Sequence, residues 1–339
     1  MPRIYNLAIL GFGNVGRSLI TLLERKREEL IAKHGFTVRI TGVASKRLGW
    51  RANPTGFDTR KLLSDGPEGE TPLNVTGWLR AARADVMFEA SSLDFETGQP
   101  AIDHIRAALN HRAHAISANK GPVVHAYREL TELAAQRKRR FFFESSVMDG
   151  VPIFAMFREG LQGIELRGFA GLLNSTTNVI LGEMEMGRTF DEAVKKAQAL
   201  GVAETDPSAD IDGWDAAVKV SALVTVLMGV DLKPQQVNRE GIRGLTREMV
   251  SKAREEGSPY KLVCRARRKG NVVETGVAPE RVPFLNPLAQ VSGTSSIISF
   301  ETDIFPALTI IEENPGLEAT AYGMLADFIS AVKSEIQRS

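Results

Sequence analysis

The feature that most constrains the fold of this chain is a glycine-rich turn close to the amino terminus. Residues 4–10 form an apolar run of strand length, "GFGNVG" follows directly, and a helical pattern continues from residue 17 to about residue 33. Gly11, Gly13 and Gly16 have the G-x-G-x-x-G spacing, which permits a tight turn, a close approach of a pyrophosphate and a close helix–strand contact. The turn therefore predicts a dinucleotide-binding unit with the phosphates at a helix amino terminus.

Strand and helix patterns alternate through the first 150 residues. Strands are expected at 37–45, 84–91, 113–119 and 140–147, and helices at 99–110 and 123–136. This alternation implies parallel crossovers, and therefore an α/β fold with a Rossmann-type doubly wound parallel sheet. The later pattern, with an acid-rich loop, a long helix at 213–228 and several strand-like pieces, indicates a second α+β domain. We expect domains at 1–148 and 149–312, and a C-terminal helix at 313–339 that packs back on the first.

The composition excludes several classes of protein. The 339 residues contain 42 Lys and Arg against 41 Asp and Glu, so no overall field attracts nucleic acid or a membrane surface. The apolar run near 218–230 is too short to span a bilayer, and the amino terminus lacks a signal-peptide pattern. Cys264 is the one cysteine, which excludes an intrachain disulfide. We expect a cytoplasmic protein with no nucleic-acid or membrane partner.

The end of the second predicted strand bears on the choice of cofactor. NAD-binding domains usually carry an acid there, which binds a ribose hydroxyl. This chain has Ser45, Lys46 and Arg47 instead. Two cations without an acid favour a 2′-phosphate and hence NADP(H) over NAD(H); the alternative is that both cations are simply solvated.

The segment "ETDPSADIDGWDAAVK", residues 204–219, leads five carboxylates into an apolar run. On a helix, Asp215 and Lys219 are four residues apart and share one face. Glu204 and Asp210 lie on the preceding loop. Because burying acids without a partner is costly, a ligand with an ammonium and a hydroxyl would explain the pattern. The alternative is a surface ion pair with an acidic loop that caps the helix.

Several segments, in this order, resemble the homoserine dehydrogenase family over nearly the whole chain. They are "GFGNVG", "LDFETGQPAIDHIRAALNHRAHAISANKGPV", "GLLNSTTNVILGEM", "AQALGVAETDPSADIDGWDAAVK", "PLAQVSG" and "TAYGMLADF". The resemblance implies an oxidoreductase that interconverts L-homoserine and L-aspartate 4-semialdehyde by hydride transfer with NADP(H), in threonine and methionine biosynthesis. It also implies a homodimer joined through the sheet of the second, substrate-binding domain.

The resemblance further implies a role for each site residue. Lys219 is the first choice for the proton carrier, with Lys120 and Asp215 as the other catalytic residues. Glu204 would bind the substrate amino group, and Asp210, Thr176 and Ser175 would be further substrate contacts. The cofactor would contact Gly11, Phe12, Gly13, Asn14, Val15, Gly16, Ser45, Lys46, Arg47, Ser91, Ser92, Asn119 and Lys120. Backbone carbonyls of Glu144, Val147, Asp149 and Val151 would hold a structural monovalent cation such as Na⁺.

Three places depart from the family pattern. Met148 and Asp149 stand where glycines are usual, Ser175 replaces a glycine beside the ligand, and "NPGLEATA" at 314–321 replaces a glycine-rich loop. Side chains at such positions can reshape a pocket. Two alternatives follow: a dehydrogenase of the same fold for another short hydroxy or amino acid, and a non-catalytic NADP-binding redox sensor. Since the sequence stops at Ser339, no appended regulatory domain is expected.

Overall fold

The computed structural model describes residues 2–336 and divides into two compact units. Unit 1 runs to Ala155 and resumes at Gly316, and unit 2 is Met156–Pro315. The sequence predicts the domain boundaries at 148/149 and 312/313. The boundaries of the compact units lie a few residues further along the chain, at 155/156 and 315/316.

Unit 1 is built on a six-stranded sheet in the order β3-β2-β1-β4-β5-β6. Five strands are parallel, which confirms the α/β class predicted from the sequence; β3, absent from the prediction, pairs antiparallel with β2 at one edge. The strands are β1 Arg3–Leu10, β2 Phe36–Ser45, β3 Gly49–Ala52, β4 Val86–Glu89, β5 His114–Ser117 and β6 Phe141–Phe142. The helices are α1 Asn14–Arg25, α2 Arg27–His34, α3 Thr59–Ser64, α4 Val75–Ala81, α5 Ala101–Asn110, α6 Gly121–Gln136, α7 Ile153–Ala155 and α13 Leu317–Ile336.

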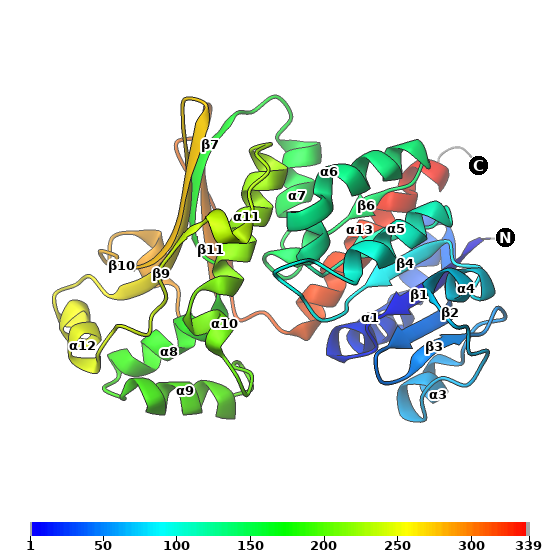
Figure 1. Ribbon diagram of the computed structural model, residues 1–339, viewed down its shortest axis with the longest axis horizontal. Helices are drawn as coiled ribbons and strands as arrows, with labels where there is room; N and C mark the ends of the chain where they lie inside the picture. The colour runs from blue at the N-terminus through cyan, green and yellow to red at the C-terminus, as the bar shows by residue number, and fades with distance from the viewer. Residues whose placement is uncertain (1, 337–339) are drawn as a thin grey trace. The chain divides into compact units, whose positions relative to one another are not determined.

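The carboxyl-terminal helix is part of the core of unit 1. Figure 1 shows α13, in red, running beside the strands and α1, with which it packs. The Phe328 ring lies 5.1 Å from Phe36, 5.7 Å from Tyr5 and 5.9 Å from Phe88, each edge to face. Such aromatic contacts stabilise a core beyond simple burial, so α13 completes the layer that covers this face of the sheet.

The strand predicted at 140–147 is much shorter in the structure. Only Phe141 and Phe142 belong to β6, and Glu144–Ser146 forms a 3-10 turn. The buried Glu144 carboxylate accepts hydrogen bonds from the N–H groups of Phe154 and Ala155 at 2.6 and 2.7 Å, while its own N–H donates to Asp327 at 2.7 Å. These bonds turn the chain away from the sheet, so the apolar run ends its strand early.

Unit 2 holds a second six-stranded sheet, in the order β12-β11-β7-β9-β10-β8. All neighbours pair antiparallel except β10 and β8, so the sheet is mixed, within the second α+β domain that the sequence indicated. Its strands are β7 Leu166–Leu172, β8 Asn238–Arg239, β9 Tyr260–Lys269, β10 Val272–Arg281, β11 Ser296–Thr302 and β12 Leu308–Glu312. The helices are α8 Ser175–Glu185, α9 Phe190–Ala199, α10 Ser208–Ile211, α11 Trp214–Leu227 and α12 Arg247–Glu255.

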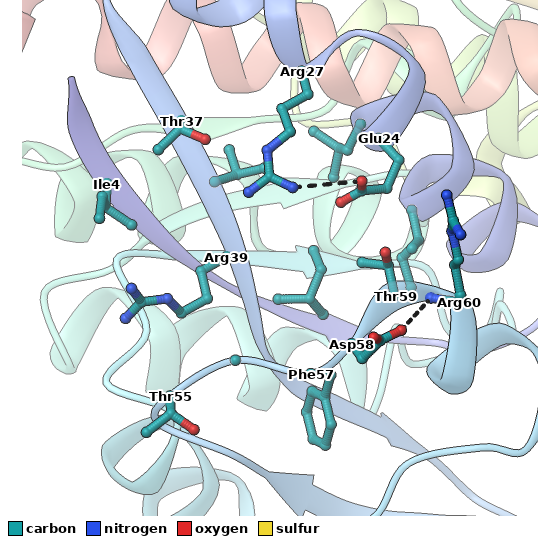
Figure 2. Close-up of a pocket in the computed structure, with 15 residues that line it drawn as sticks. Ile4, Glu24, Arg27, Thr37, Arg39, Thr55, Phe57, Asp58, Thr59 and Arg60 are labelled. Carbon is teal, nitrogen blue, oxygen red and sulfur yellow. Dashed lines mark hydrogen bonds and ion pairs between the residues drawn. The ribbon is translucent and has the colours of Figure 1, made fainter.

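A surface groove of about 430 Å³ lies in unit 1 at the amino-terminal half of β2. Apolar and polar side chains both line it, and Figure 2 shows Arg27 directed toward Glu24, with which it forms an ion pair of 3.6 Å. The glycine turn follows the opposite, carboxyl-terminal end of β1. The groove is therefore separate from the predicted cofactor site. Within residues 2–336 no helix combines the length and hydropathy needed to cross a membrane.

Candidate functional site

The three glycines of the amino-terminal turn have different surroundings. Gly11 has a φ of +103°, and a Cβ there would lie 2.2 Å from the Ala90 carbonyl oxygen. A Cβ at Gly16 would lie 2.1 Å from the Gly11 oxygen, whereas one at Gly13 would meet nothing within 4 Å. Gly11 and Gly16 therefore allow close backbone contacts that any side chain would block. Gly13 instead leaves open space at the start of α1. Since no side chain caps α1, its amino terminus fits a pyrophosphate.

The turn after β2 places its two cations in solvent. Lys46 and Arg47 are both exposed, and among the residues that the structure describes neither forms an ion pair. Ser45 accepts a hydrogen bond from the Leu48 N–H at 3.1 Å, which tightens the turn. The two cations can therefore turn toward an anionic group at this end of β2.

The loops after β4 and β5 are joined by hydrogen bonds. The buried Asn119 amide donates to the carbonyls of Ser91 at 3.2 Å and Ser92 at 3.3 Å, and its oxygen accepts the Gly121 N–H at 2.8 Å. Lys120 is the first residue before α6. The structure thus brings these four predicted residues to the carboxyl ends of neighbouring strands, where ligands of doubly wound sheets bind.

In unit 2 four polar side chains from three segments converge. The Asn174 amide donates to Asp210 at 2.6 Å and to Asp215 at 3.0 Å. Lys219 forms an ion pair with Asp215 at 3.0 Å and donates to the Leu173 carbonyl. The Lys219 and Asp215 side chains are only 15% and 20% exposed, so the pair is not an ordinary surface salt bridge.

Burial and charge in this cluster shift the protonation of Asp210. Desolvation raises the pKa of its carboxyl, and the neighbouring Asp215 raises it further; Asn174, Lys219 and Thr176 oppose the shift. Asp215 lies in the first turn of α11, where the helix dipole favours a negative charge. The arrangement holds two carboxylates and an ammonium together, a lining suited to a small ligand with an amino group and a reactive oxygen.

Asn174 is absent from the set predicted from the sequence. It caps α8 by accepting the Thr177 N–H at 2.9 Å, while its amide binds carboxylates 36 and 41 residues further along the chain. An Asn between a strand and a helix is an ordinary capping signal. That signal reveals the cap but not the carboxylates, which only the folded chain brings to it.

The other three acids of the 204–219 segment lie outside the cluster. Glu204 is exposed, and Gln198 donates to its backbone carbonyl at 3.2 Å. Asp206 accepts hydrogen bonds from Ser208, and Asp212 pairs with Arg243 at 3.0 Å. No contact within unit 2 brings the predicted amino-group ligand Glu204 to Asp210 or Asp215.

The departures from the family pattern have local explanations. The Ser175 hydroxyl donates to the Thr294 carbonyl at 3.0 Å, and the buried Thr176 hydroxyl donates to Val202 at 3.2 Å. Asp149 adopts a glycine-like φ of +43° and accepts a hydrogen bond from Thr320 at 2.7 Å. Met148 is buried. Ser175 is thus tied to a neighbouring loop, and Asp149 is anchored to α13.

The segment with the predicted cation ligands is tightly packed in unit 1. The Val151 N–H donates to the Met148 carbonyl at 2.9 Å, and Val147 and Glu144 are buried. A Cβ at Gly150 would lie 2.3 Å from the Ala319 oxygen. Across residues 2–336 no group of three or more His, Cys, Asp or Glu side chains could hold a metal ion; cation binding here would use backbone oxygens, including those of Asp149.

Comparisons with known proteins cover both units. Residues 152–329 match the family described as homoserine dehydrogenase, and residues 11–144 match the homoserine dehydrogenase NAD-binding domain. An NAD⁺-dependent homoserine dehydrogenase of Pseudomonas canavaninivorans is 34% identical over 98% of both chains.

Solved structures give the same result. A homoserine dehydrogenase of Thiobacillus denitrificans superposes with a TM-score of 0.86 at 30% identity, over 99% of this chain and 75% of that one. A mutant homoserine dehydrogenase of a hyperthermophilic archaeon, in complex with NADPH, gives a TM-score of 0.82 at 27% identity over 98% of both chains. With its nicotinamide-cofactor domain and its Asn174–Asp210–Asp215–Lys219 cluster, the chain belongs to the homoserine dehydrogenase family of oxidoreductases.

Proposed function

We propose that the protein interconverts L-homoserine and L-aspartate 4-semialdehyde, in the biosynthesis of threonine and methionine. The observation that carries the proposal is the half-buried Lys219–Asp215 ion pair, joined through Asn174 to a second carboxylate. The cluster lies in a chain that matches the family in both units. A substrate amino group would neutralise Asp210, and the substrate oxygen would lie near the Lys219 ammonium.

In this reaction the side chains move and hold protons. During reduction of the aldehyde, Lys219 would donate a proton to the oxygen as it becomes a hydroxyl, and Asp215 would orient the ammonium and favour its recharging. Lys120 is the other lysine proposed for this role. Thr176, Ser175 and Glu204 are proposed substrate contacts. A bound nicotinamide supplies or accepts the hydride, and Gly13, the start of α1, Ser91 and Asn119 would hold the cofactor.

The direct test follows NADPH absorbance with L-homoserine and with aspartate semialdehyde, alongside a panel of other short hydroxy and amino acids. Turnover of homoserine well above the rest of the panel supports the proposal. Preference for another compound would favour a related dehydrogenase. Cofactor binding without turnover of any compound would favour a redox sensor.

We further propose NADP(H) as the preferred cofactor, supported by the exposed Lys46 and Arg47 at the end of β2. The NAD⁺-dependent relative makes this preference worth testing directly. Replacing both cations with alanine should raise the KM for NADPH by roughly tenfold for each lost charge-assisted contact, with little change for NADH. Arg60→Ala, an exposed cation away from this turn, is the matched control. An unchanged ratio of NADPH to NADH KM values would contradict the preference.

A homodimer is proposed through the exposed face of the second sheet. Along β9 the exposed Arg265 and Arg267 alternate with the buried Cys264 and Ala266, so one face of the strand is uncovered. A hollow of about 240 Å³ on this face is lined by Arg265 and Arg267 and by their partners on β7, Ala170 and Gly168. Light scattering at micromolar concentration should give the mass of two chains; a monomer at every concentration would contradict this.

Two smaller proposals complete the assignment. Carbonyls of Glu144, Val147, Asp149 and Val151 would hold a structural Na⁺, supported by the tight backbone packing of this segment. The single, buried Cys264 supports a place in the reducing cytoplasm.

A further inference from the structure

Glu89 is a fully buried carboxyl at the point where three parallel strands of unit 1 end. Leu10, Glu89 and Ser117 are register partners on β1, β4 and β5, and Glu89 is 0% exposed. Within residues 2–336, Glu89 has hydrogen-bond partners but no cation paired with it. An uncompensated carboxylate in such a place is costly. The reaction proposed above does not use it, so its position needs another explanation.

The partners of Glu89 belong to the two loops that follow β4 and β5. One carboxyl oxygen accepts the Ser91 N–H at 3.2 Å and also the Ser91 hydroxyl. The other lies 3.4 Å from the Ser117 hydroxyl, which in turn accepts the Asn119 N–H at 3.0 Å. Asn119 closes the ring by donating to the carbonyls of Ser91 and Ser92. A single buried carboxyl therefore links residues 90–92 to residues 117–120.

The hydrogen-bond count favours a carboxyl that carries a proton. The Ser117 hydroxyl has one proton and two acceptors in reach, Glu89 at 3.4 Å and the Asn119 carbonyl at 3.2 Å. A protonated Glu89 can donate to Ser117, which then donates to Asn119, so both acceptors are satisfied. Burial raises the pKa of Glu89 to about 7, with the Ser91 hydrogen bonds opposing the shift. The groups facing the carboxyl, from Ser91, Ser117 and Asn119, are all uncharged.

The linked loops lie on the half of the sheet that receives the second nucleotide. In doubly wound sheets a dinucleotide binds across the point where the strand order reverses, with its pyrophosphate at the first strand–helix turn. Here that point lies between β1 and β4, and the Gly11 backbone touches that of Ala90. Because the end of β2 faces the adenosine ribose, the loops after β4 and β5 face the nicotinamide half.

We propose that Glu89 is a positioning residue for cofactor binding, holding residues 90–92 and 117–120 at the separation that the nicotinamide half requires. The inference rests on the proposed function, because it takes these loops as the cofactor side. Glu89 acts through Ser91, Ser117 and Asn119, and touches neither substrate nor cofactor.

The test measures the Kd of NADPH by fluorescence from about pH 6 to pH 9, for the wild type, Glu89→Gln and Glu89→Ala. Asp85→Asn is the matched control. Asp85 precedes the opposite end of β4, accepts the Asn6 N–H at 2.8 Å, and also has a pKa raised by burial. It has no contact with either loop.

Glu89→Ala should raise the Kd about tenfold at neutral pH, since two loops lose their common partner, and Asp85→Asn should leave it unchanged. The Kd of Glu89→Gln should stay within about threefold of the wild-type value, because the amide keeps an acceptor for Ser91 and a donor for Ser117.

In the wild type the affinity for NADPH should fall as pH rises through about 7. An ionised Glu89 accepts a hydrogen bond from the Ser117 hydroxyl, which then no longer donates to Asn119, and it also adds a negative charge near an anionic cofactor. The Gln variant should lose this dependence. The cofactor 2′-phosphate titrates alike with every variant, so the difference between the two curves isolates Glu89.

Identical pH curves for the wild type and Glu89→Gln would overturn the inference, as would an equal loss in Asp85→Asn and Glu89→Ala. If Glu89→Ala fails to fold, the Gln curve alone decides. Binding is measured without substrate: Glu89-dependent NADPH binding in a protein that leaves homoserine unchanged would refute the proposed function and retain this inference. A wild type that binds neither NADPH nor NADH would refute both.

Discussion

Replacing Lys219 with methionine should lower kcat for homoserine oxidation by about 10²- to 10⁴-fold, the usual contribution of a positioned proton carrier. Methionine keeps much of the side-chain volume but removes the ammonium that pairs with Asp215 at 3.0 Å. The substitution also removes a positive charge that lowers the pKa of Asp210, so the pKa of Asp210 should rise further. The Kd of the cofactor should stay at the wild-type value, because the glycine turn belongs to the other unit.

Lys252→Met is the matched control for this variant. Lys252 also pairs with an acid four residues away on a helix, Glu256 at 3.8 Å, but its side chain is 76% exposed against 15% for Lys219. Steady-state rates and cofactor binding should match the wild type in the control. If Lys219→Met kept kcat within about threefold of the wild type, Lys219 would be an ion-pair partner only, and Lys120 would become the proton carrier to test.

Gly11→Ala should destabilise the protein by about 3–5 kcal/mol, much of the free energy of unfolding of a typical domain. The new methyl group would occupy a φ of +103° and lie 2.2 Å from the Ala90 oxygen, so β1 or β4 must move. Urea unfolding with the family cofactor absent measures this cost. A midpoint equal to the wild type would contradict the packing described for the turn.

Gly13→Ala separates packing from ligand binding in the same turn. A Cβ at this position meets nothing within 4 Å, so its effect on stability should be under about 1 kcal/mol. The same methyl group should block the approach of a pyrophosphate and raise the Kd of NADPH tenfold or more, roughly the loss of one charge-assisted hydrogen bond. If both variants lost stability equally, or Gly13→Ala bound NADPH normally, the turn would have a structural role alone.

Features set by near neighbours in the chain could be predicted from the sequence. The strand–turn–helix at Gly11–Gly16 follows from glycine spacing and apolar periodicity, and the structure places β1 and α1 around it. The shared face of Asp215 and Lys219 follows from the helical repeat, and the two side chains do form an ion pair. In such cases backbone geometry alone fixes which side chains are close together.

The tertiary structure decided everything that depends on distant segments meeting. Asn174 reaches Asp210 and Asp215 across 36 and 41 residues. Glu89 lies between two loops only because β1, β4 and β5 pair in one register. Of the five acids in residues 204–219, only Asp210 and Asp215 bind Asn174. The apolar run at 140–147 ends its strand early because Asp327 accepts the Glu144 N–H and the Glu144 carboxylate accepts the N–H groups of Phe154 and Ala155. These contacts arise from burying the apolar faces of whole elements together, a cooperative outcome that local residue spacing does not encode.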